Sequence, residues 1–75
     1  MSEGRQLRGV SGDQAVRALV RAGGTARTGK GDHVNVAMPN GVVITIPRHR
    51  ELKVGLLSAA IRRAGLTKAQ FAELL

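Results

Sequence analysis

The spacing of hydrophobic residues changes along the chain, and near the start it predicts a helix. Ser11-Gly12-Asp13-Gln14 has the form of a capping box, in which Ser11 begins the helix and the Gln14 side chain reaches back to it. Gly23-Gly24 ends the helix, because glycine readily adopts the left-handed conformation found after helix C-termini. The apolar residues at helical spacing, which we expect to be buried, are Ala15, Val16, Leu19 and Val20.

Alternation of apolar and polar residues then predicts strands. Residues 25–28 form a weak first strand, and residues 29–32 form a glycine-containing turn. Residues 33–38 alternate more clearly than any other segment, which is typical of a strand with one buried face. Val34, Val36 and Met38 lie on one face, and His33, Asn35 and Ala37 lie on the other.

A hairpin and a third strand follow. Asn40-Gly41 between alternating segments is a strong hairpin signal. Residues 42–46 then form a strand that ends before Pro47, because proline cannot donate a hydrogen bond to a sheet. Val42, Ile44 and Ile46 share one face, and Val43 and Thr45 share the other.

The remaining chain returns to helical spacing. A second helix begins at about Gly55 and ends at Gly65. A second capping box, Thr67 to Gln70, starts a short helix that runs toward Leu75. The residues that we expect these two helices to bury are Leu57, Ala60, Ile61, Ala64, Phe71, Leu74 and Leu75.

This order of elements predicts an α+β fold with helices on one face of a three-stranded antiparallel sheet and a short C-terminal helix. Because the apolar strand faces would meet the helices, His33 would lie on the open face. Residues 1–10 show no hydrophobic period, so we expect a flexible N-terminal lead-in, with Leu7 or Val10 attached to the core. Residues 11–75 then form one domain, as is typical of a chain of 75 residues.

The composition favours a nucleic-acid partner. Twelve Lys and Arg against five Asp and Glu give a net charge of +7, and most of the basic residues are arginine, whose guanidinium group matches phosphate geometry. The same charge would also suit an acidic protein, or serve only solubility. With no cysteine and two histidines, we expect neither disulfides nor a protein metal site. No apolar segment approaches the roughly 18 residues of a membrane span, and the first residues do not resemble a signal peptide, so we expect a cytoplasmic protein.

Five short motifs together connect the chain to a known family. They are Val10-Ser11-Gly12, the block Arg27…Lys30-Gly31-Asp32-His33, Ile46-Pro47-Arg48-His49, Glu51-Leu52-Lys53-x-Gly55-x-Leu57, and Ala64-Gly65-Leu66. In order and spacing they resemble the HicA-type toxins, the mRNA interferases of bacterial toxin–antitoxin pairs. The chain departs from the family's pattern at Asp32, usually serine, and at Val34, often histidine or another polar residue. It also departs at Gly24, usually aromatic, which should loosen the packing there.

The resemblance implies a fold like that of double-stranded-RNA-binding domains, α-β-β-β-α. It implies an endoribonuclease that cleaves mRNA and is inhibited by a HicB-like antitoxin, with neither a small-molecule cofactor nor a membrane involved. The family's catalytic histidine corresponds to His33.

The chemistry of histidine fits that role for His33. RNA can be cleaved without a metal ion, because its 2′-hydroxyl can attack the adjacent phosphorus when one group takes a proton and another protonates the leaving oxygen. An imidazole with the ordinary pKa of about 6.5 can do either. Asp32 would orient His33 or simply cap the turn. The alternative for His33 is a surface histidine without a role.

The candidate residues for binding RNA phosphates lie on both sides of His33 in the sequence. Arg27 and Lys30 would stabilise charge on phosphate oxygens, and Gly31 would allow close backbone approach; the alternative is a solvated basic turn. His49 would bind phosphate or, as we favour, order the turn into the second helix. The other candidates, with an ordinary solvated surface as the alternative, are Arg48, Arg50, Lys53, Arg62 and Arg63.

Two other functions remain open besides the endoribonuclease toxin. One is a non-catalytic RNA-binding module of the same fold. Since Phe71 is the only aromatic residue, its binding would depend on phosphate contacts and shape rather than on base stacking. The other is a protein-interaction domain whose basic surface meets only an acidic antitoxin.

Overall fold

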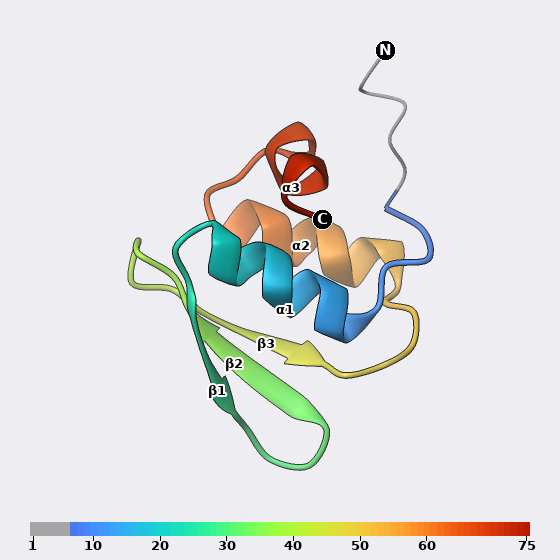
Figure 1. Ribbon diagram of the computed structural model, residues 1–75, viewed down its shortest axis with the longest axis vertical. Coiled ribbons are helices and arrows are strands. Elements are labelled where there is room, and N and C mark those ends of the chain that lie inside the picture. Colours follow the sequence, from blue (N-terminus) through green and yellow to red (C-terminus); the bar gives the residue numbers. More distant parts are fainter. Residues whose placement is uncertain (1–6) are drawn as a thin grey trace.

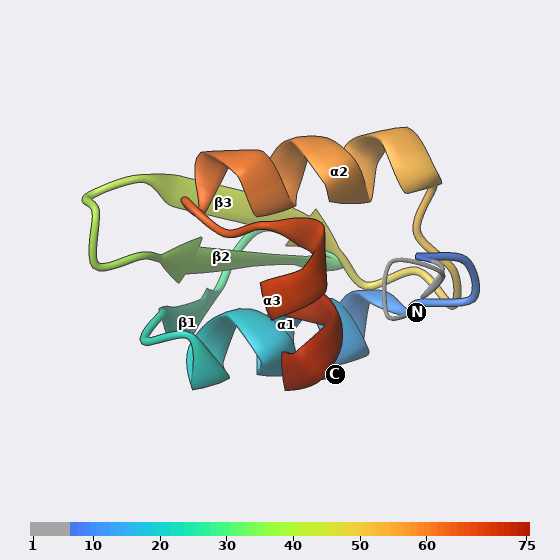
Figure 2. The ribbon, with the colours of Figure 1, turned by 90° about the horizontal axis from the view of Figure 1, so that it is seen from above.

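The computed structural model describes residues 7–75, which contain three helices and one three-stranded sheet (Figure 1). The elements are α1 (Gly12–Arg21), β1 (Thr25–Thr28), β2 (His33–Ala37), β3 (Val43–Pro47), α2 (Val54–Arg63) and α3 (Lys68–Leu74). The strands are antiparallel in the order β1-β2-β3. Figures 1 and 2 show α1 and α2 on one face of the sheet, and the described residues leave the other face open. The predicted α+β fold, α-β-β-β-α as in double-stranded-RNA-binding domains, is confirmed.

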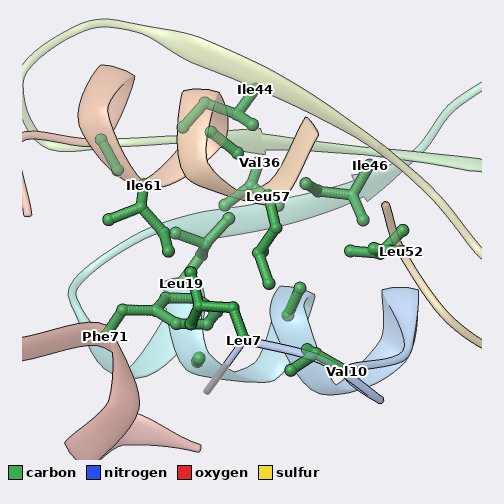
Figure 3. Packing of buried hydrophobic residues seen from close by; sticks show 14 of the residues in the cluster. Leu7, Val10, Leu19, Val36, Ile44, Ile46, Leu52, Leu57, Ile61 and Phe71 are labelled. Atoms are coloured by element: carbon green, nitrogen blue, oxygen red, sulfur yellow. The ribbon is translucent and has the colours of Figure 1, made fainter. Parts of the chain in front are cut away.

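The core lies between the sheet and the helices. Figure 3 shows side chains from β2 and β3 facing those from α1, α2 and α3. The largest buried side chains are Phe71, Leu19, Ile44, Ile46, Leu52, Leu57, Ile61 and Val36. Leu7 and Val10 also belong to this core, as expected. Residues 1–6 of the predicted lead-in lie outside the described residues, and residues 8 and 9 form a turn. The assignment of residues 11–75 to a single domain stays a prediction.

Both predicted capping boxes are present. The Ser11 hydroxyl accepts a hydrogen bond from the Gln14 backbone N–H at 3.0 Å, and the Gln14 side chain accepts one from the Ser11 N–H at 2.9 Å. Thr67 and Gln70 make the same reciprocal pair at the start of α3. Gly23 follows α1 with a φ of 106°, a conformation that favours glycine. The helix limits were therefore readable from local sequence.

Two apolar residues are not buried as predicted. Val20 is 43% exposed, because the buried stripe of α1 is centred on Ala15, Ala18 and Leu19 instead. Ala18 is fully buried, but a single methyl group gives only a weak hydrophobic signal. Leu75 is 37% exposed, because α3 ends at Leu74 and Leu75 follows the helix as its C-cap.

The expected loose packing at Gly24 is wrong. A Cβ atom at this position would lie 2.6 Å from Val36 Cγ1 and 2.8 Å from Met38 Sδ. The side chains of β2 and the residue after it therefore fill the space beside Gly24. The Leu19 backbone oxygen would also lie 2.9 Å from this Cβ atom, so a larger residue would require both side chains and the backbone to move.

Candidate functional site

His33 is the first residue of β2 and is exposed at the edge of the open face. It lies opposite Pro47, the last residue of β3, so it marks the end of the sheet away from the β2–β3 hairpin. Its ring Nδ1 lies 3.1 Å from the carbonyl oxygen of Lys30. With Nδ1 as the donor, the lone pair resides on Nε2, which can then accept a proton.

Backbone hydrogen bonds hold the turn that carries His33. The His33 N–H donates to the Lys30 carbonyl at 3.0 Å, and the Gly29 N–H donates to the His33 carbonyl at 2.8 Å. Gly31 has a φ of 56°, a left-handed conformation in which a side chain would be strained. The turn therefore fixes both the backbone and the ring of His33.

Arg48 is held beside this turn by two contacts. Its backbone N–H donates to the Asp32 carbonyl at 2.7 Å, and its Nε donates to Asp13 Oδ1 at 3.0 Å. The hydrogen bond with Asp13 raises the pKa of Arg48, and the negative charges of Asp13 and Asp32 raise it further. The guanidinium group therefore stays charged. Its side chain is also partly exposed, so its terminal nitrogens are available to an anion.

The N-terminus of α1 reaches the same end of the sheet. The Gly12 N–H donates to the His49 carbonyl at 2.8 Å, and a Cβ atom at Gly12 would lie 2.1 Å from the Pro47 oxygen. Only glycine permits this close approach, which brings Asp13 within reach of Arg48. The sequence analysis gave Asp13 only a place in the first helical turn, because nothing local links residue 13 to residue 48.

The other predicted phosphate-binding residues fall into separate places. Arg50 and Lys53 are exposed in the connection after β3, and Lys53 directly precedes α2. Arg62 and Arg63 lie in the last turn of α2, where the Arg63 carbonyl accepts from Asn40 Nδ2 at 3.1 Å. That contact places Arg62 and Arg63 near the β2–β3 hairpin, at the opposite end of the sheet from His33.

The open face carries a polar row of three residues, of which the sequence analysis selected only Arg27. Arg27 on β1 lies opposite Asn35 on β2, which in turn lies opposite Thr45 on β3. Thr45 Oγ1 donates to Asn35 Oδ1 at 2.7 Å. The alternation of residues 33–38 already placed Asn35 on the same face as His33, and this was the signal available in the sequence.

The described residues contain neither a cluster suited to a metal ion nor a helix suited to cross a membrane. Across residues 7–75, no group of three or more His, Cys, Asp or Glu side chains is placed to hold a metal ion. Within the same range, every helix is too short or too polar to span a membrane.

The comparison with protein families decides the identity. The family model described as "HicA toxin of bacterial toxin-antitoxin" matches residues 12–66, which is well over half of the chain. The chain belongs to the HicA toxin family. The predicted resemblance is confirmed, and with it a place in a toxin–antitoxin system. The matched part of this HicA-family chain contains Asp13, His33 and Arg48, whereas α3 lies beyond it. No curated protein matches the chain.

Proposed function

We propose that this HicA-family chain is an endoribonuclease that cleaves mRNA without a metal ion, with His33 as general acid and base. The observation that carries the proposal is the exposed His33 ring, fixed by the Lys30 carbonyl at 3.1 Å. A catalytic imidazole needs this combination of access and fixed orientation. The charged Arg48 guanidinium is held beside the same turn.

Nε2 of His33 takes the proton of a 2′-hydroxyl as the 2′-oxygen attacks the adjacent phosphorus. A bond forms between phosphorus and the 2′-oxygen, the bond from phosphorus to the 5′-oxygen breaks, and the imidazolium of His33 gives its proton to the leaving 5′-oxygen. Proton transfer of this kind contributes about 100- to 10,000-fold to a rate. Lys30 and Arg48 offset the negative charge that grows on the phosphate oxygens.

The partner in this proposal is a HicB-like antitoxin, and the site of action is the cytoplasm, where mRNA is found. A net charge of +7 on 75 residues suits an acidic partner surface. Inhibition follows most directly if the antitoxin covers His33 and neutralises the basic residues around it. A complex that leaves His33 open to solvent would contradict this part of the proposal.

The deciding experiment is an RNA digest by the purified protein in the presence of a chelator, beside His33→Ala. We expect the wild-type protein to cut RNA and the variant to lose cutting by at least about 100-fold while it keeps its fold and RNA affinity. Because His33 is exposed and outside the core, the substitution removes no packing. Equal cutting by the variant contradicts the role of His33. RNA binding without cutting by the wild type supports the binding-module alternative.

A further inference from the structure

A hollow of about 530 Å³ lies on the open face of the sheet, and Arg27 and Asn35 of the polar row line it. Its lining residues are Thr25, Arg27, Thr28, Asn35, Ala37 and Val43. Its volume is in the range of small-molecule sites, which is large enough for one nucleotide. The proposed reaction at His33 assigns no role to this hollow.

Asn35 presents a fixed hydrogen-bond donor to this hollow. Its Oδ1 accepts from Thr45 Oγ1 at 2.7 Å, which fixes the orientation of the amide. Its Nδ2 makes no hydrogen bond within residues 7–75, so both of its N–H groups are available. A Cβ atom at Gly29 would lie 3.2 Å from this Nδ2, so glycine keeps the space beside the amide open.

The chemistry of the hollow suits one nucleotide of RNA. Ala37 and Val43 give an apolar floor, and Val43 is 51% exposed although it is a large hydrophobic residue. Arg27 supplies a positive charge for a phosphate, or a plane on which a base can stack. In a β-strand, residues two apart lie about 7 Å from each other on the same face, so Asn35 is one step from His33.

We propose that this hollow binds the nucleotide next to the bond cut at His33, taken from a single-stranded segment of RNA. Asn35 Nδ2 donates to the base or sugar, and Arg27 contacts the phosphate. The segment is single-stranded, because a base must be unpaired to enter the hollow. This inference rests on the proposed function for its choice of ligand, and it makes Asn35 a residue that sets substrate preference.

The test uses a 2′-O-methyl oligonucleotide of about ten nucleotides, which lacks the attacking hydroxyl and so cannot be cut by this route. We expect Asn35→Asp and Arg27→Ala each to weaken its binding to the full chain by about three- to tenfold. Asn35→Asp keeps the size of the side chain and the acceptor for Thr45, but it removes the Nδ2 donor and adds a negative charge that also repels phosphate. The matched control is Arg17→Ala, which removes the same charge from the exposed side of α1 and should leave affinity nearly unchanged.

NMR spectra of the wild-type protein give a second measurement that depends on no variant. We expect the Asn35 side-chain amide and the β1 amides to shift on binding, with smaller changes at Arg17 on α1. Unchanged affinity of both variants, shifts confined to the helices, or equal binding of a duplex would overturn the inference. Because binding is measured without cleavage, a failure here is distinguishable from a failure of His33 to cut RNA.

Discussion

At the scale of single residues, the site depends on contacts that hold charged groups beside the turn of His33. Gly12 allows α1 to approach the end of β3, since a Cβ atom there would meet the Pro47 oxygen. That approach places Asp13 against Arg48. Arg48 in turn donates its backbone N–H to the Asp32 carbonyl, one residue before His33. In the proposed site, Asp13 would therefore position Arg48 rather than contact RNA itself.

We predict that Asp13→Ala lowers RNA cleavage severalfold while the melting temperature changes little. The Asp13–Arg48 ion pair is about half exposed, and exposed pairs contribute little to stability. Without its partner, however, the Arg48 side chain is free to leave the turn. Glu73→Ala on α3 removes the same charge at an exposed position and should not alter the rate. Cleavage rates and thermal unfolding of both variants check this prediction. An equal loss of cleavage rate in Glu73→Ala would mean that net charge, and not the position of Arg48, causes the effect.

At the scale of elements, α3 stands apart because the family match ends at residue 66, before this helix begins. Even so, α3 is joined to the rest of the fold. Phe71 is fully buried, and Arg21 Nη1 on α1 donates to the Leu74 carbonyl at 2.6 Å. Figure 3 shows the Phe71 ring beside Leu19 and Leu7. The short helix thus closes the end of the core between α1 and α2.

We predict that Phe71→Ala destabilises the protein by about 3–5 kcal/mol, because it leaves a large cavity in a small core. A chain of this size has little stability to lose, so a large part of the population should unfold. Leu75→Ala alters an exposed residue at the end of the same element and should change stability by less than about 0.5 kcal/mol. Urea unfolding of both variants measures the difference. A small effect of Phe71→Ala would show that α3 is dispensable for the core.

At the scale of the whole molecule, positive charge is distributed over several sides of the fold. Lys30 and Arg48 lie at the His33 end of the sheet, whereas Arg62 and Arg63 lie near the hairpin at the other end. Arg27 lies between them on the open face. A long RNA strand can therefore meet cations at both ends of the sheet, whereas a short one meets only those near the site that it occupies.

We predict that RNA affinity falls with salt, with a slope of log K against log salt concentration of about −3. A slope of this size corresponds to roughly four phosphate contacts on single-stranded RNA. Removal of one contact, as in Lys30→Ala, should reduce the slope by about 0.7. Binding titrations at several salt concentrations provide the measurement. A slope near zero would favour a domain that meets only a protein partner.

The sequence by itself determined the elements and their faces, although β3 (Val43–Pro47) includes Pro47, which the sequence analysis had placed after the strand. The signals that did so act over only a few residues, so they can be recognised in the sequence alone. They are the capping boxes at Ser11 and Thr67, the glycines at helix ends and the alternation in β2. They also placed His33 on the open face. The errors at Val20 and Leu75 arose because a local pattern does not fix which residues of α1 face the sheet or where the last helix ends.

Only the tertiary structure decided which side chains meet. Two arrangements join segments that lie apart in the chain: the contact of Asp13 with Arg48, and the row of Arg27, Asn35 and Thr45. The fold also places Arg63 at the opposite end of the sheet from His33. Such pairings depend on strand register and on how closely a helix can approach the sheet. Those distances are fixed by turn conformation and by the volume of the shared core, which belong to the folded chain as a whole.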